Sequence, residues 1–529
     1  MAHLSGTDRV QLLLLPEAVD DYVGPGNPGR FIEAFVDGLD LAAAGFVRVT
    51  AKETGRPGYD PADLLKLYVY GYINRVRSSR RLEAETHRNI EVIWLLRHLK
   101  PDFRTIADFR RMNRSAFKQV FREFVILCRQ LDLFGRELLA VDGTRIKAVN
   151  NKDRNFTRGA LTKFIREADE KLADYVKRLD ECDADEDKMT SSGSDRGDGK
   201  LAEKFAAIEG KRDRHKALLD ELDKTGEDQI SLTDPDARAM ARMTKVGVGY
   251  NIQLAVDVKH KLIAEQEVCN QVLDMGLLAP TVKAAMDTLG VDRIEAVADR
   301  GYFKIEDIEA CERAGITAYV PKPIRGPAVA EGFFSKEEFR YDPDKNIYRC
   351  PADQVLSPRH FGKSRDNVKI DHVNRDACKA CSLRERCTQS FRRVSRLENE
   401  AVLDRMAQRL VARPDILDRR RESVEHPFGT IKQWMYQGAF LMRRLENVRG
   451  EFSLTALAYN IRRAITLVGV AGLIAALRTV LNKIAYSKTF NNALSGLLGI
   501  EIQKISNPQS SGTGQRMSSF IQRVFRRFA

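Results

Sequence analysis

The chain has 529 residues, enough to form several domains around at least one sizeable apolar core, which excludes a disordered protein. Its 87 Lys and Arg against 74 Asp and Glu give a net charge of +13, which favours a polyanionic partner. The amino terminus lacks a secretory signal pattern, and the longest uncharged apolar run, residues 464–477, is shorter than the ~20 residues of a membrane span. We therefore expect a cytoplasmic protein with no membrane partner, in which this run forms a buried core helix.

Residues 1–135 predict a helical amino-terminal domain. From residue 60 onward, apolar side chains recur at helical spacing, and basic residues such as Arg75, Arg77, Arg110 and Arg111 stand between them. Basic helices interleaved with aromatic residues can dock on duplex DNA by neutralising its phosphates. The alternative is a helical packing domain whose charged exterior is merely solvated.

Two apolar segments each lead to an aspartate. Residues 138–141 predict a buried strand followed by Asp142 and Gly143, and residues 294–298 predict a strand that ends at Asp299. Asp-Gly by itself is a common hairpin turn, so Asp142 alone signifies little. If the two strands lie side by side, however, both carboxylates project from one sheet edge and can hold a divalent metal. The rival carboxylates are Asp153, Asp234, Asp236 and Asp257.

The order of predicted elements indicates an α/β fold with two insertions. Three strands, a helix, a strand, a helix and a strand over residues 136–158 and 229–325 predict a mixed sheet with helices on its faces, completed by residues 405–470. Residues 159–228 have heptad-like spacing and predict an inserted helical hairpin. Residues 326–404 form a Cys-containing insertion, and residues 471–529 a carboxy-terminal tail. After Asn507 the tail ends in RMSSFIQRVFRRFA, which is either a basic amphipathic helix or a frayed end, and we expect the frayed end.

The second insertion predicts a metal site of another kind. Four of the eight cysteines lie there, at Cys350, Cys378, Cys381 and Cys387. Four thiolates suit a tetrahedral structural zinc, although only one Cys-x2-Cys pair is present. Reduced, unligated thiols in a surface loop are the alternative, and His360 or His372 could replace one ligand. Cysteines in this pattern also favour a reducing compartment.

A third carboxylate, Glu425, lies in a basic segment between Arg421 and Lys432. Helical spacing places this acid between two cations, which an ordinary surface ion-pair ladder would also explain. Pro427 and Gly429 fall in the same predicted helix although both residues weaken helices, which indicates that helix stability alone did not shape the segment. We place Glu425 near the start of this helix, free to point at the sheet edge.

Three stretches together resemble the Asp-Asp-Glu (DDE) transposases of bacterial insertion sequences: LLAVDGTRIKA, AVADRGY, and Arg421, Glu425 and Lys432 in the order RxxxExxxxxxK. The stretch GRPGYDPADLLKLYVYGYINRVRSSRRLEAE resembles the helical amino-terminal domain of that family. The resemblance implies an RNase H-like catalytic core whose metal ligands are Asp142, Asp299 and Glu425. The family pattern has a Tyr three residues before the Arg, whereas this chain has Asp418, so the role of that Tyr in positioning DNA is unfilled.

The resemblance further implies DNA cleavage and joining with two Mg²⁺ or Mn²⁺ ions, because hard carboxylates suit these ions and the ions activate the attacking oxygen. Water would attack at the terminal inverted repeats, and the freed 3'-hydroxyl would then attack target DNA. Pairing two ends implies a homodimer on double-stranded DNA, in the bacterial nucleoid. The residues expected to bind DNA are Arg421, Lys432, Arg443 and Arg444, and Trp434 either stacks on a displaced base or packs in the core.

Two other classes of function compete. A non-catalytic or degenerate DNA-binding protein would share the basic helices, but it would have no reason to place three acids at the ends of strands and helices. A metal-dependent nuclease that only hydrolyses DNA would use the same site without joining.

Overall fold

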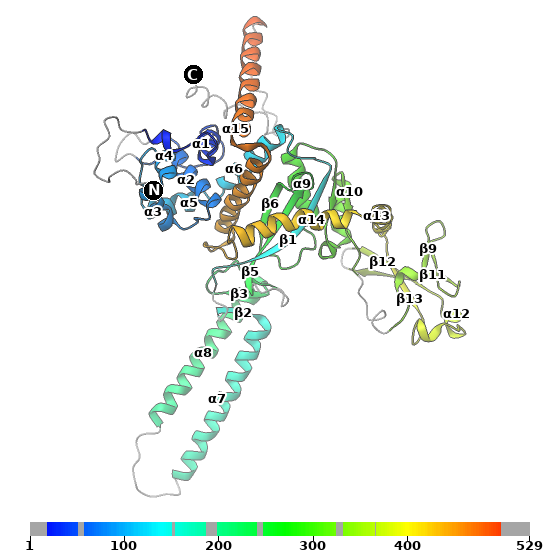
Figure 1. The fold of residues 1–529 in the computed structure, drawn as a ribbon. Coiled ribbons are helices and arrows are strands. Elements are labelled where there is room, and N and C mark those ends of the chain that lie inside the picture. Colours follow the sequence, from blue (N-terminus) through cyan, green and yellow to red (C-terminus); the bar gives the residue numbers. More distant parts are fainter. Residues whose placement is uncertain are drawn as a thin grey trace, which may run out of the picture.

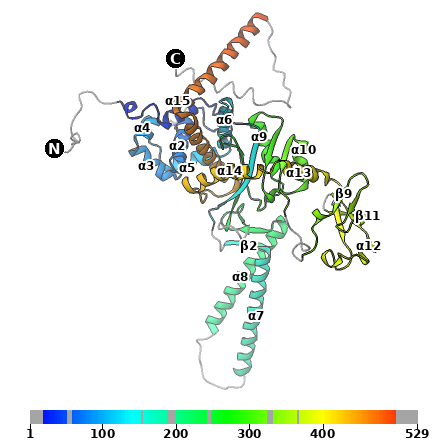
Figure 2. The same ribbon diagram turned by 45° about the vertical axis from the view of Figure 1, so that its right-hand side comes forward.

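The computed structural model describes residues 18–50, 58–150, 154–186, 198–240, 247–323, 332–364 and 367–498. Within these ranges the protein is a mixed α/β fold. A helical unit at the amino terminus packs beside a sheet unit, and a helical hairpin and a small β unit project from the sheet unit in different directions (Figure 1, Figure 2).

The helical unit forms around α2 (Pro61–Ile73), which is buried on almost every side. Proline in the first turn and a side-chain cap from Asp60, which accepts a bond from the Ala62 amide, set the start of this helix. Aromatic rings from neighbouring helices, among them Tyr68 and Phe117, fill the interior. The other helices are α1 (Pro28–Asp37), α3 (Ser79–Arg88), α4 (Ile90–Leu95), α5 (Phe103–Met112) and α6 (Ala116–Gln130).

A six-stranded mixed sheet forms the core of the second unit. The strand order is β4-β5-β1-β7-β8, with β6 also paired to β5; β7 runs parallel to β1 and β8, and β5 antiparallel to β1 and β6. The predicted order of strands and helices is confirmed. The elements are β1 (Leu138–Lys147), β4 (Arg238–Ala239), β5 (Val248–Asp257), β6 (Ile263–Cys269), α9 (Leu278–Leu289), β7 (Ile294–Val297), α10 (Ile305–Arg313) and β8 (Ile316–Tyr319).

One local prediction was wrong. Asp142 and Gly143 do not form a turn, because β1 continues to Lys147. The partner strand β5 is long enough to pair with β1 over its whole length, from Leu139 opposite Asp257 to Lys147 opposite Gly249. Asp142 therefore lies in the middle of a strand instead of at its end.

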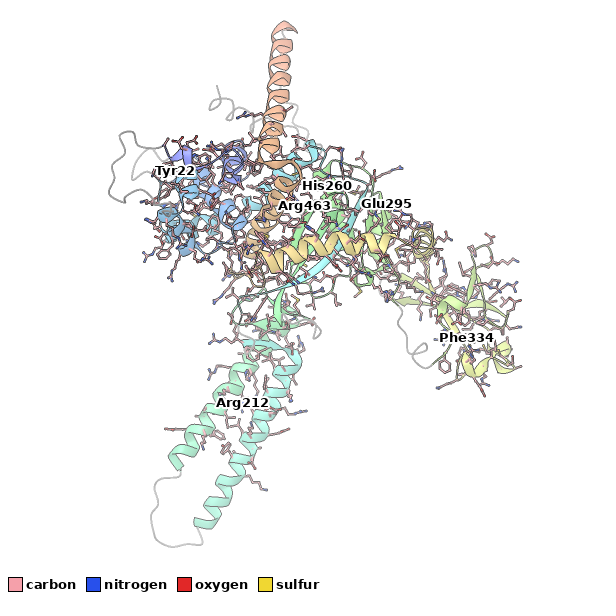
Figure 3. All side chains as sticks on the ribbon, viewed as in Figure 1. Tyr22, Arg212, His260, Glu295, Phe334 and Arg463 are labelled. Carbon is pink, nitrogen blue, oxygen red and sulfur yellow. The ribbon has the colours of Figure 1, made fainter. Side chains whose placement is uncertain are left out.

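A long carboxy-terminal helical stretch, α15 (Leu445–Leu498), joins the two units and is broken at Gly469, whose φ of 72° and ψ of 165° are not helical. It packs against α1, α2 and α6 of the helical unit and against β6 of the sheet. Where α15 meets the turn after β5, Arg463 Nε donates a 2.8 Å bond to the carbonyl oxygen of His260 (Figure 3). The stretch Leu445–Thr479 is also long and apolar enough to cross a membrane, and 33% of its most apolar window is buried in the fold. The break lies within residues 464–477, most of which are not buried, so the prediction of one buried core helix there was wrong. Helical structure resumes after Gly469 and extends to Leu498, so the predicted tail begins as helix; its remainder lies outside the described residues.

Two structures project from the sheet unit. The first is a hairpin of α7 (Arg158–Glu186) and α8 (Asp198–Thr225), which rests on the short strands β2 (Asn155–Thr157) and β3 (Gln229–Ser231). The second is a five-stranded sheet with its own small apolar cluster around Phe334 and Tyr348 (Figure 3). Its strands are β9 (Arg340–Asp342), β10 (Ile347–Arg349), β11 (Val355–Ser364), β12 (Asn367–Val373) and β13 (Arg393–Leu397), with the short helix α12 (Arg375–Lys379).

The chain returns to the main sheet through α13 (Ala401–Ala412) and α14 (Ile416–Gly429). α14 packs on β1 and β5, with Ile416, Val424 and Pro427 buried. It runs into a π-helical turn, η6 (Thr430–Trp434), closed by a 2.8 Å bond from the Met435 amide to the Thr430 carbonyl oxygen. Such wide turns inside helices are frequent at functional sites.

Candidate active site

The register of the sheet places Asp142 and Asp299 at matching positions relative to two neighbouring strands. β1 and β7 are adjacent and parallel, with Ala140 opposite Val297, and each aspartate follows two residues later. Because side chains alternate along strands, Asp142 shares a face with Ala140. β7 ends at Val297, and Asp299 caps the short helical turn that follows by accepting a 2.8 Å bond from the Gly301 amide. The predicted neighbourhood of these two strands is confirmed.

An arginine that the sequence analysis did not single out lies between the two acids. Nη2 of Arg420, on α14, is 2.8 Å from Oδ1 of Asp142 and 3.7 Å from Oδ2 of Asp299. Its Nε is buried and has no hydrogen-bond partner among the described residues. One cation therefore contacts both carboxylates while part of its own hydrogen-bonding capacity is unused.

Burial makes the charged form of Asp142 costly and raises the pKa of its carboxyl group to about 6. The Arg420 guanidinium opposes this shift, whereas the nearby carboxylates of Asp299 and Asp274 add to it. Arg420 thus balances only part of the cost of burying a charged Asp142 beside two other carboxylates.

Asp274 is a third carboxylate at this site, and it was not predicted from the sequence. It follows β6 and is held by Arg145 Nη2 at 2.9 Å, Asn251 Nδ2 at 2.8 Å and Gln253 Nε2 at 2.8 Å. The signal in the sequence was the pair of amides, two positions apart in an otherwise apolar strand, because buried amides need partners.

The glycine beside Asp142 makes room for this arrangement. A Cβ on Gly143 would lie 2.6 Å from Nε2 of Gln253 and still closer to Oδ1 of Asp274. Close packing around Asp274 therefore requires a glycine at position 143, whereas no turn is formed there.

Glu425 lies elsewhere on α14. It is the tenth residue of a helix that begins at Ile416, so its predicted place near the start was wrong. Its neighbour Val424 is buried against the sheet, while Glu425 is exposed and makes no hydrogen bond or ion pair within the described ranges. Its assignment as the third metal ligand stays a prediction.

The predicted phosphate-binding residues differ in their surroundings. Lys432 lies in the π-helical turn, where desolvation lowers the pKa of its amine and Asp142 opposes that shift, so it belongs to the same site. Arg421 points to solvent and pairs with Asp418 at 3.5 Å. Arg443 and Arg444 are exposed just before α15.

The rival aspartates that the structure describes have other roles. Asp257 ends β5 opposite Leu139, near the start of β1, and there it accepts hydrogen bonds from the amides of Gly135 and Arg136. Asp234 and Asp236 accept bonds from the backbone amides of Arg444 and Leu445 at the start of α15. Asp153 lies outside the described residues.

The four predicted zinc ligands gather in the β unit. The thiols of Cys378, Cys350 and Cys381 each act electrostatically on Cys387, whose pKa is raised chiefly by burial. All four are free thiols. As they stand, neither these thiols nor any other three His, Cys, Asp or Glu side chains in the described part of the chain are close enough to hold a metal ion.

Two family models match the chain. A model described as Transposase domain (DUF772) matches residues 17–112, which contain most of the helical unit. A model described as Transposase DDE domain matches residues 349–465, from β10 to the middle of α15, including Arg420 and Glu425. The chain is an insertion-sequence DDE transposase. No curated protein matches it, and no solved structure does.

This transposase therefore acts on DNA, and its family uses divalent metal ions. The matched regions leave out Asp142 and Asp299, whose convergence is an independent observation from the fold. A single guanidinium reaches both carboxylates, so one cation position serves both, and their hard oxygen atoms suit Mg²⁺ or Mn²⁺. Asp142 and Asp299 could thus supply two ligands to a divalent ion, and within the described ranges no third His, Cys, Asp or Glu is close enough to complete such a site.

Proposed function

We propose that this transposase binds the terminal inverted repeats of its insertion sequence, cleaves at them, and joins the freed 3'-hydroxyl to target DNA. The observation that carries the proposal is the convergence of Asp142 and Asp299 on one cation just beyond the carboxyl end of β7. The strand order also supports an RNase H-like core, because three antiparallel strands, β6, β5 and β1, continue into two parallel ones, β7 and β8.

Asp142, Asp299 and Glu425 would hold two Mg²⁺ or Mn²⁺ ions in this proposal. When bound, such ions stabilise the charge of the phosphoryl transition state and lower the pKa of the attacking oxygen. Arg420 would leave the acid pair, and Asp274 would keep Arg145, Asn251 and Gln253 in place behind it. Lys432 is near enough to Asp142 to bind a phosphate group at the same site.

The remaining parts of the proposal concern partners and assembly. Double-stranded DNA would bind through Arg421, Arg443 and Arg444 as well, whose guanidinium groups are exposed and suit phosphate. Two copies would act together, since two element ends must be paired. The protein would work in the cytoplasm on nucleoid DNA, and Cys350, Cys378, Cys381 and Cys387 would bind one structural Zn²⁺.

The test is cleavage and strand transfer on a labelled duplex that carries the element's own end, with Mg²⁺ or Mn²⁺. We expect the wild type to cut and join, and the Asp142→Ala, Asp299→Ala and Glu425→Ala variants to bind the duplex without reacting. Glu422→Ala is the matched control for the third acid, because Glu422 is an exposed glutamate on the same helix.

Each failure has its own meaning. If Glu425→Ala stays active and Glu422→Ala does not, the third ligand is Glu422. Cutting without joining would indicate a hydrolytic nuclease, and binding without cutting would indicate a regulator or a degenerate transposase.

A further inference from the structure

A second group of cations gathers where the helical unit meets the sheet unit. The Arg75 guanidinium carbon lies 3.7 Å from the centre of the Trp434 ring, and that of Arg462 lies 3.6 Å from it. Two guanidinium groups cannot both stack this closely on one face, so each face of the indole carries one arginine. Trp434 is therefore not free to stack on a displaced base.

Three separate elements build this cluster. Arg75 follows α2, Trp434 ends the π-helical turn, and Arg462 lies on α15. Arg77 fixes the contact from the helical unit, because its guanidinium donates bonds to the carbonyl oxygens of Tyr436 and Ala439. The cluster exists only when the two units are docked.

The two arginines are not neutralised. Neither forms an ion pair with an acid within the described ranges. Desolvation lowers the pKa of Arg462, and the positive charge of Arg75 lowers it further. Two like charges held on one ring repel each other, which costs free energy that a bound anion would recover. Arginine on an aromatic face is also held in a fixed plane, ready for a planar two-point contact with phosphate.

The backbone around the cluster is strained. Arg75 has a φ of 65° and Tyr436 a φ of 52°, although neither is glycine. Such conformations persist where surrounding structure enforces them, often at binding sites. Tyr436 is 68% exposed, and Arg75 lies 5.5 Å from its ring centre, so an aromatic surface flanks the cations.

We propose that Arg75 and Arg462, stacked on the two faces of Trp434, bind the DNA backbone at the junction of the helical and sheet units, each guanidinium contacting a phosphate of its own. The site rests on the proposed function in that its ligand is the DNA substrate. It positions the duplex without reading its sequence, because phosphates carry no base information. It also makes DNA binding depend on docking of the two units.

The experiment measures the affinity of the full chain for a duplex carrying the element's end, and for an unrelated duplex, across a series of KCl concentrations. Each phosphate contact contributes about 0.9 to the slope of log K against log salt. We expect Arg75→Gln with Arg462→Gln to reduce the slope by about 1.8, because two phosphate contacts are lost, and to weaken binding to both duplexes equally. The double Lys variant should keep the wild-type slope, because it keeps the charge.

Arg30→Gln is the matched control. Arg30 also stacks on an indole, that of Trp94, but Asp20 neutralises it at 3.0 Å. Its slope should equal that of the wild type, and thermal unfolding checks that every variant is folded. An unchanged slope in the double Gln variant overturns this inference and leaves the transposase proposal standing. A wild type that binds neither duplex at any salt concentration overturns both.

Discussion

Replacing Arg420 with Gln tests whether this arginine occupies the place of a metal ion. The substitution removes the only cation that the structure places in ion-pair contact with both Asp142 and Asp299, at 2.8 and 3.7 Å. Three carboxylates, including Asp274, then repel one another with less compensation. We expect the metal-free variant to be less stable than the wild type and to bind Mn²⁺ more tightly, because Mn²⁺ no longer competes with an internal cation.

The size of the effect follows from burial. Removing one partner of a fully buried ion pair costs ~3–5 kcal/mol. The side chains here are 16% exposed for Arg420, 21% for Asp142 and 47% for Asp299, so solvent screens part of the interaction. We expect a loss of about 1–3 kcal/mol in the metal-free state and a gain in Mn²⁺ affinity of about 5- to 150-fold.

Isothermal titration with Mn²⁺ measures the affinity, and urea unfolding with and without Mn²⁺ measures stability. Arg419→Gln is the control, because Arg419 is exposed on the same helix and makes no ion pair with these acids. If Arg420→Gln binds Mn²⁺ no better than the wild type, Arg420 does not compete with metal, and its role is to hold the two acids in position.

Three further predictions concern stability and metal content. Gly143→Ala should lower the free energy of unfolding in urea by ~1–3 kcal/mol, because the new Cβ overlaps held polar atoms, whereas Gly210→Ala, with nothing within 4 Å, should not. Burial raises the pKa of Asp142 from 3.8 to about 6, so protonation of this group favours the folded state. As the pH rises from below 4 to above 6, the free energy of unfolding of the metal-free wild type should therefore fall by ~3 kcal/mol relative to that of Asp142→Asn. Parallel pH profiles of the two proteins would contradict this. Elemental analysis of the purified chain should find one zinc ion, and the Cys381→Ser variant should lose it. Cys311→Ser is the control and should keep the zinc, because Cys311 is buried outside the β unit. Full zinc in both variants, or none in the wild type, would refute the zinc site.

The sequence by itself determined the order of the elements and two of the acids. Apolar runs separated by helical patterns predicted a mixed sheet, and the sheet is present with β1 beside β7. This was possible because strands buried on both faces appear as short continuous apolar runs, whereas helices show a longer apolar period, and both patterns are local properties of the chain. The stretches that resemble DDE transposases, such as LLAVDGTRIKA and AVADRGY, are equally local.

Only the tertiary structure decided how the candidate site is composed. Asp142 was predicted at a turn because Asp-Gly usually forms one, but pairing with β5 extends the strand through it. Arg420 and Asp274 are far from Asp142 in sequence, and nothing local distinguishes them from other charged residues. They meet because α14 packs on β1 and the segment after β6 folds back over Gly143. Convergence of charges from separate elements depends on packing between elements, which local pattern does not encode.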